Sequence, residues 1–163
     1  MDIRKIYEYA LQREYEGKRF FVENAERLSH PAAAKAFKEL AAEEEKHILF
    51  IQSQITALDK GELESSALAQ KLQGDGFYSQ RAHSEMFDQT VLEAICPDLP
   101  VLRMAYLIEA DFADFYAKSA KQATGEAKKV LKMLAKWETS HEALFKDLHD
   151  KVYEIYSEMP WGG

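Results

Sequence analysis

The chain has few of the residues that interrupt or cross-link a fold. Its 163 residues include one cysteine, four prolines and seven glycines. The lone cysteine, Cys96, has no partner for an internal disulfide and leaves no Cys-x-x-Cys pair for a four-cysteine metal site. Apolar residues make up 47 % and charged residues 30 %. This composition excludes collagen and disorder and favours a helical globular protein in a reducing compartment.

Basic residues are also in the minority. The 21 Lys and Arg against 28 Asp and Glu give a formal net charge of −7. We therefore exclude nucleic acid and anionic membranes as main partners, because both require a basic face. No stretch approaches the roughly 18 apolar residues of a membrane span, and the first residues lack the apolar run of a secretory signal. We expect a cytoplasmic protein.

Apolar residues recur three and four positions apart along four stretches, which is the spacing of amphipathic helices. The first helix is predicted over 2–28, and the second begins at Pro31 and stops at Gly61. The third follows Pro100 and ends near 124–125, and the fourth continues to about 157.

The 61–99 stretch has weaker periodicity, and we interpret it as a long connection that is helical over about 84–95. Two helical hairpins, 2–60 and 100–157, joined in this way form a four-helix bundle whose second and third helices are parallel. The prediction is an all-α single domain over 1–163, with a tail at 158–163. An up-down-up-down bundle with short loops is the lesser alternative.

Polar side chains interrupt each apolar stripe near its middle. The six positions, one or two per helix, are Glu14, Glu44, His47, Glu109, Glu138 and His141. Four carboxylates pointing into one core need cations, because an isolated buried carboxylate is very costly. The neighbouring Arg13 and Lys46 point about a third of a turn away. Metal is the simplest counter-charge.

The spacing of these residues supports a site for two ions. Residues three apart lie on one helix face, so Glu44 with His47, and Glu138 with His141, can each reach one ion. The carboxylates of the other two helices would bridge the ions or complete their coordination, and four carboxylates balance two divalent ions. Carboxylate and imidazole ligands suit iron or manganese.

The two hairpins look like copies of one unit. Glu14 precedes Glu44 by 30 residues and Glu109 precedes Glu138 by 29. An aromatic residue follows the first carboxylate of each copy by seven positions: Phe21 and Tyr116. A pseudo-twofold axis would then relate the two metal positions.

The remaining histidines and several aromatic residues have simpler interpretations. Three histidines without a glutamate three residues earlier are predicted to lie at the surface: His30, His83 and His149. Aromatic residues at helical spacing are interpreted as packing residues. They include Tyr7, Tyr15, Tyr106 and Phe112.

The order Glu, Glu-x-x-His, Glu, Glu-x-x-His on four helices resembles the ferritin-like di-iron carboxylate superfamily. Within it, ALQREYEGKRFF at 10–21 and AAEEEKH at 41–47 most resemble the rubrerythrin family. The resemblance covers both hairpins. It implies a ferritin-like bundle that holds two iron ions, or manganese, at the six positions, with Tyr116 as a hydrogen-bond partner of a ligand.

The chain departs from rubrerythrins in two ways. Rubrerythrins usually append a four-cysteine rubredoxin domain, whereas Cys96 is alone here, so we expect electrons from a separate, rubredoxin-like protein. They also carry an additional glutamate one turn after the third-helix ligand, where this chain has Phe112; Gly17 is the corresponding residue of the first copy. The resemblance implies a homodimeric peroxide reductase or ferroxidase that reacts with peroxide or O2.

Other functions stay open. The chain is alternatively an iron-storage subunit, which needs a closed shell, or an O2-dependent hydroxylase, whose apolar pocket Gly17 and Phe112 would shape. A third interpretation belongs to another functional class. In it, the protein is a metal-free helical interaction module whose acidic positions bind no iron or manganese.

Overall fold

The computed structural model describes residues 2–62 and 87–160, and these residues form helices joined by short turns. The four long helices are α1 (Ile3–Ala25), α2 (Pro31–Asp59), α6 (Leu99–Gln122) and α7 (Gly125–Glu158). Two short elements, α5 (Gln89–Ala94) and the 3₁₀ helix η1 (Cys96–Asp98), precede α6. The all-α prediction is confirmed. In the described ranges, no helix combines the length and apolar character needed to cross a membrane.

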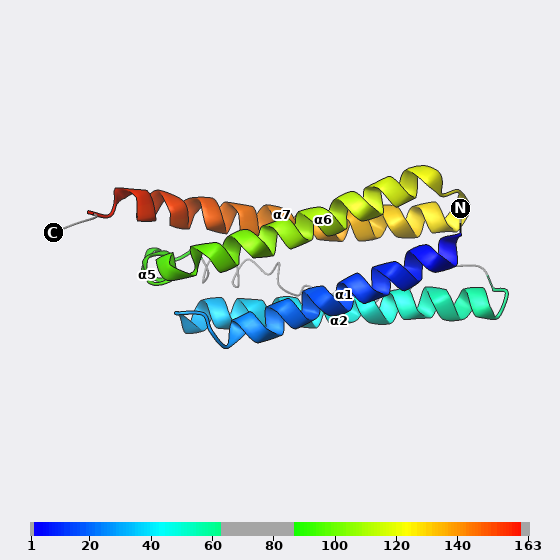
Figure 1. Cartoon of the computed structure of the whole chain (residues 1–163), viewed down its shortest axis with the longest axis horizontal. Helices are drawn as coiled ribbons and strands as arrows, with labels where there is room; N and C mark the ends of the chain where they lie inside the picture. Colours follow the sequence, from blue (N-terminus) through cyan, green and yellow to red (C-terminus); the bar gives the residue numbers. More distant parts are fainter. Residues whose placement is uncertain (1, 63–86, 161–163) are drawn as a thin grey trace.

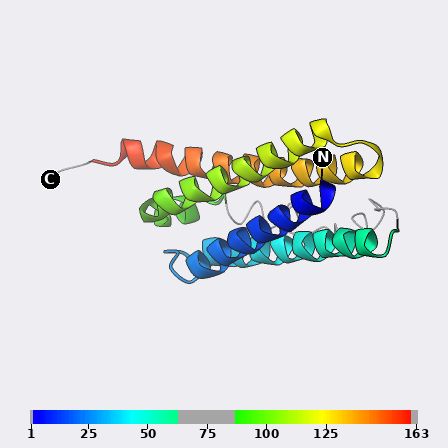
Figure 2. The same ribbon diagram turned by 45° about the vertical axis from the view of Figure 1, so that its right-hand side comes forward.

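The long helices form two antiparallel hairpins. Helix α1 packs mainly on α2, and α6 packs mainly on α7. Figures 1 and 2 show α2 and α6 running in the same direction, with α1 and α7 opposed to them. The C-terminal end of α2 lies at one end of the bundle and α5 at the other (Figure 1). This confirms the bundle with a long crossover and excludes the up-down-up-down alternative.

Local sequence chemistry explains where the first hairpin begins and turns. The Asp2 side chain accepts a hydrogen bond from the Lys5 amide and caps α1. The Nδ1 atom of His30 accepts from the Ala32 amide at 3.1 Å, and Pro31 occupies the first turn of α2. Gly61, just beyond the end of α2, has a φ of 67°, which glycine adopts without strain.

Two helix ends differ from the prediction. Helix α1 ends at Ala25 rather than 28, because the chain turns toward the second hairpin: the Ser29 amide donates to Asp98 Oδ2 at 2.8 Å and its hydroxyl to Oδ1 at 3.2 Å. Helix α6 ends at Gln122, two residues before the expected stop.

The predicted crossover helix over 84–95 is partly recovered. The described part of this range is helical from Gln89 to Ala94, because the Asp88 side chain caps it by accepting from the Thr90 amide. Residues 84–86 lie outside the described ranges. The connection then continues through η1 directly into α6.

The core has two apolar halves, one toward each end of the bundle. One half contains a group of mutually contacting rings, Phe21, Phe37 and Phe145. The other half contains Tyr7, Phe50 and Trp137. The six polar positions occur between these residues along every long helix. The apolar halves therefore hold the polar positions from both sides, which fixes the geometry of a site at mid-bundle.

The contact between Asp98 and Ser29 predicts a measurable loss of stability in a variant. Asp98 is buried, and Asp98→Ala leaves the Ser29 amide and hydroxyl without their acceptor. Urea denaturation should show a free energy of unfolding lower by about 1–3 kcal/mol. The exposed Asp111 on α6, the helix that follows η1, provides the control, since Asp111→Ala should change the free energy of unfolding by less than about 0.5 kcal/mol. Equal effects of the two substitutions would contradict the assignment.

Candidate metal centre

The structure brings the six predicted polar residues together at mid-bundle. They are Glu14 on α1, Glu44 and His47 on α2, Glu109 on α6, and Glu138 and His141 on α7. We call them the Glu/His cluster. The four glutamates are 0 % exposed and the two histidines 3 % and 2 %. Carboxylates are almost never buried so completely without a counter-charge.

The cluster divides into two overlapping groups of potential metal ligands. Glu14, Glu44, His47 and Glu138 place one ligand atom each within 4.8 Å of one another, as do Glu44, Glu109, Glu138 and His141. Two residues, Glu44 and Glu138, belong to both groups. The sequence left open whether Glu14 and Glu109 bridge two ions or complete their coordination. The geometry favours the second alternative, because Glu14 and Glu109 each belong to one group, whereas Glu44 and Glu138 belong to both.

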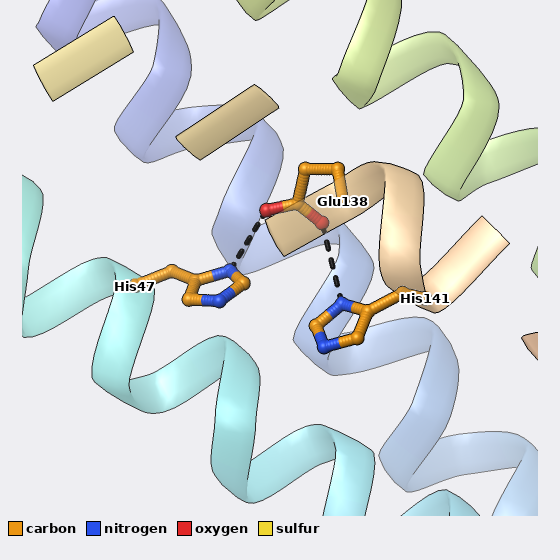
Figure 3. A group of neighbouring side chains, drawn as sticks. All are labelled: His47, Glu138 and His141. Carbon is orange, nitrogen blue, oxygen red and sulfur yellow. Dashed lines mark ion pairs between the residues drawn. The ribbon is translucent and has the colours of Figure 1, made fainter. Parts of the chain in front are cut away.

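Figure 3 shows Glu138 of α7 between the two histidines. Its Oε1 lies 2.9 Å from His47 Nδ1, and its Oε2 lies 3.4 Å from His141 Nδ1. Glu44 spans the same pair less closely, at 3.6 Å from His47 Nδ1 and 3.5 Å from His141 Nδ1. Glu14 approaches only His47, at 3.3 Å, and Glu109 only His141, at 3.5 Å. Each histidine therefore defines one side of the cluster.

Lysine and arginine do not neutralise this cluster in the part of the chain that is described. Lys46 pairs with Glu43 at 2.6 Å, and the Arg13 guanidinium lies against aromatic rings instead of a carboxylate. Both carboxylate oxygens of Glu44 and of Glu109 are buried without a hydrogen bond. Buried oxygens of this kind, beside two imidazole nitrogens, fit hard or borderline divalent cations.

Burial and mutual repulsion make two of the carboxyl groups hard to ionise. Burial, followed by the charge of Glu138, raises the pKa of Glu44 to about 8. Burial, followed by the charges of Glu44 and Glu138, also raises the pKa of Glu109 well above its usual range. In the metal-free protein, burial and repulsion therefore favour the protonated form of both groups. Divalent ions would replace those protons.

Glu138 and His47, whose side chains approach most closely within the cluster, have pKa values shifted in opposite directions. Burial acts to raise the pKa of Glu138, but the charge of His47 and contacts with both histidines outweigh it and keep that pKa below its usual value. Burial acts to lower the pKa of His47, but the charges of Glu138, Glu44 and Glu14 raise it well above its usual value. An ionised Glu138 and a protonated His47 therefore form the metal-free ion pair.

Tyr116 lies where the family resemblance placed it. Its hydroxyl donates a hydrogen bond to Glu14 Oε1. Burial, followed by the charge of Glu14, raises the pKa of Tyr116 well above its usual value, so the phenol stays protonated and remains a donor. A donor to the outer oxygen orients Glu14 toward the cluster.

The sequence interpretation missed Trp137. Its indole ring stacks on the His47 imidazole, with centroids 4.9 Å apart and planes 15° apart, and forms a wall of the cluster. Its position four residues before His141 was an available signal, because that spacing places both on one face of a helix.

Gly17 and Phe112 lie beside the cluster, but they leave no pocket between them. A Cβ atom on Gly17 would be 2.9 Å from Phe112 Cε2 and 3.8 Å from Glu44 Oε2. The ring of Phe112 thus fills the space in which the hydroxylase interpretation expected a cavity. Phe112 is a packing residue, as predicted.

Other aromatic and histidine predictions had mixed outcomes. Tyr15 was interpreted as a packing residue but is 48 % exposed, and its hydroxyl accepts from Gln52 Nε2 at 2.9 Å. It lies one position after Glu14, on a different face of α1. His149 is half-buried against Tyr106 rather than fully at the surface. His83 lies outside the described residues.

The pKa shifts predict that the metal-free protein loses stability as pH rises. Glu44 ionises near 4.5 when unfolded and near 8 when folded, so between these values the native state holds the extra proton. Glu109 and His47 shift in the same direction. The free energy of unfolding should therefore fall from pH 5 to pH 8, by up to about 1.4 kcal/mol per pH unit for each proton.

Urea unfolding with a chelator present measures this slope. Glu44→Gln should make it shallower, because glutamine has no proton to lose, and Glu45→Gln, at the exposed neighbouring position, should leave it unchanged. A metal-free protein whose stability rises over this pH range would contradict the pKa directions.

Comparison with known proteins agrees with this geometry. No curated protein and no solved structure matches the chain. A rubrerythrin family model matches residues 5–149, a range that contains both hairpins and all six residues of the Glu/His cluster. The buried cluster is consistent with the dinuclear metal site of that family. This chain belongs to the rubrerythrin family.

Proposed function

We propose that this protein is a dinuclear iron oxidoreductase that reduces hydrogen peroxide, with O2 as a second oxidant. The observation that carries the proposal is the pair of overlapping four-residue groups that share Glu44 and Glu138. Two ions held by groups that share two residues would be neighbours, and could supply electrons to one substrate. Rubrerythrins are typically peroxidase-like oxidoreductases, and the family match agrees with this chemistry.

The donor set fits iron. Four carboxylates balance the charge of two ferrous ions, and the two imidazoles add one nitrogen ligand to each group. Manganese suits the same ligands and is the alternative outcome of a metal analysis. Ferrous ions held there would supply the electrons for reduction of peroxide to water.

The protein residues have distinct roles in this proposal. Glu44 and Glu138 would hold both ions, while Glu14 with His47 and Glu109 with His141 would each complete one side. Tyr116 orients Glu14 through its hydrogen bond. The rings of Trp137 and Phe112 keep bulk water away from the cluster, which strengthens electrostatic interactions inside it.

The electrons come, in this proposal, from a redox protein that carries a rubredoxin-like site. Cys96 is the single cysteine of the sequence, is buried, and cannot form such a site alone. The homodimer expected from the family resemblance stays a prediction. A closed shell in light scattering would favour iron storage instead.

Metal binding tests the cluster directly. We expect anaerobically reconstituted protein to bind two Fe²⁺ per chain and to be stabilised, by about 2.7 kcal/mol when free metal is one hundred times Kd. Glu44→Gln and Glu138→Gln should lose both ions, because each residue serves both groups. Glu14→Gln and Glu109→Gln should weaken one ion each.

Metal analysis and thermal unfolding measure these effects, and Glu45→Gln is the matched control. Glu45 precedes Lys46 in the same acidic run, but its side chain is exposed and pairs with Lys18. A protein with neither iron nor manganese and no thermal shift would favour the metal-free interaction module.

Peroxide titration tests the reaction. Anaerobic, iron-loaded protein should gain near-ultraviolet ferric absorption on addition of hydrogen peroxide. Tyr116→Phe removes the hydrogen bond to Glu14 but keeps the ring, and should slow this oxidation by about 10-fold with both ions retained. Tyr15→Phe removes an exposed hydroxyl one position from Glu14 and should have no effect. Iron-loaded protein that peroxide does not oxidise would refute the proposed activity.

A further inference from the structure

The ring of Phe112 lies against α1 at Gly17, near Glu44. Gly17 is fully buried there, and a Cβ atom at this position would be 2.9 Å and 3.2 Å from two ring carbons of Phe112. The same point is 3.8 Å from Glu44 Oε2. The absent side chain of Gly17 therefore provides the space for the ring, and the ring lies beside one of the two shared carboxylates.

Arg13 covers Phe112 from the solvent side. Its guanidinium carbon is 4.7 Å from the centroid of the Phe112 ring, and the side chain is half-buried. One guanidinium nitrogen donates to the Tyr9 hydroxyl at 3.3 Å, while Nε is buried without a hydrogen-bond partner. The guanidinium thus contacts the ring through a cation–π interaction, which is weaker than a carboxylate ion pair. Phe112 separates this cation from the cluster.

The other aromatic walls of the cluster are held more firmly. Trp137 stacks on His47 and also contacts Phe50. Tyr116 contacts Phe115 and hydrogen-bonds to Glu14. Among the described residues, Phe112 forms no stacked or edge-on pair with another aromatic ring, although it packs in the apolar half that contains Tyr7. Its partner across the bundle is a glycine.

Phe112 also lies at the boundary between the two hairpins. It belongs to α6, which packs mainly on α7, whereas Gly17 and Arg13 belong to α1, which packs mainly on α2. A rotation of this side chain, or a small shift between hairpins, would open a path to the cluster. Of the three rings beside the cluster, Phe112 is the one that neither a ring pair nor a hydrogen bond holds in place among the described residues.

We propose that Phe112 is a size filter, which admits oxidants of two or three heavy atoms to the Glu44 side of the metal centre and excludes ring-sized or branched organic molecules. This inference rests on the proposed function, because it assigns a substrate class to the same site. Only 4 % of Phe112 is exposed, so entry requires the ring to move, and the displacement grows with the size of the entering molecule. Arg13 holds the ring in its closed position.

Ligand binding to the cobalt-loaded protein tests the filter without turnover. The probes are azide, with three atoms, and imidazole, a five-membered ring, and the readout is the visible spectrum of bound Co²⁺. Azide should change the spectrum of the wild type and of all variants. Imidazole should leave the wild-type spectrum unchanged and should change the spectra of Phe112→Ala and Phe112→Leu, whose affinity for imidazole should be at least about tenfold above that of the wild type.

Phe37→Leu is the matched control, because it removes the same volume from the aromatic group around Phe145, away from Gly17. It should exclude imidazole as the wild type does. If Phe112→Ala does not fold, Phe112→Leu and Arg13→Gln still test the filter. Arg13→Gln keeps the ring but removes the cation, so imidazole should change the spectrum of this variant although it leaves that of the wild type unchanged.

Peroxide selectivity in the iron-loaded protein gives a second readout. The ratio of the rate with tert-butyl hydroperoxide to the rate with hydrogen peroxide should rise at least about tenfold in Phe112→Leu and stay unchanged in Phe37→Leu. Three results would overturn the filter and leave the proposed function intact. They are binding of imidazole to the wild type, exclusion of imidazole by both Phe112 variants, and a Phe37→Leu variant that binds imidazole as the Phe112 variants do. If the wild type binds no cobalt, the visible spectrum of Co²⁺ is absent before any probe is added. This result would overturn both the filter and the proposed function.

Discussion

The burial of four carboxylates with only two imidazoles is the constraint on which this structure depends. Each hairpin contributes two of the carboxylates, so their repulsion acts between hairpins as well as within them. Apolar packing toward both ends of the bundle holds the acids in place, but it does not neutralise them. Neutralisation requires protons or metal ions at mid-bundle. Metal ions held there would therefore also join the two hairpins.

Protons and metal ions compete for the same oxygens. In the metal-free protein, Glu44 and Glu109 are held neutral by burial and repulsion, and Glu138 forms the ion pair with His47. Metal ions that bind the cluster would replace these protons. Uptake of metal must then release protons, which links affinity to pH through the residues that bind the metal.

Much of the fold and the cluster could be predicted because burial is costly for a carboxylate and helical periodicity shows which residues point inward. Glu14 and Glu109 were recognisable from the apolar residues three and four positions away. The sharing of Glu44 and Glu138 was not predictable, because it depends on how far the hairpins slide along one another. The end of α1 depended on Asp98, a contact between residues 69 positions apart. Trp137 was missed because an aromatic residue at helical spacing usually belongs to the core.

The contact between Gly17 and Phe112 also bears on how the hairpins recognise each other. The two residues occupy equivalent positions, each three residues after the first carboxylate of its copy. A bundle made of two α1–α2 hairpins would place glycine opposite glycine and leave a void. A bundle made of two α6–α7 hairpins would place one phenylalanine ring against another. In the unlike pair, the ring of Phe112 occupies the space that the missing side chain of Gly17 leaves. The two hairpins are similar enough that two of the same kind could otherwise pair. The contact between Gly17 and Phe112, beside the Glu/His cluster, favours pairing of one first hairpin with one second hairpin.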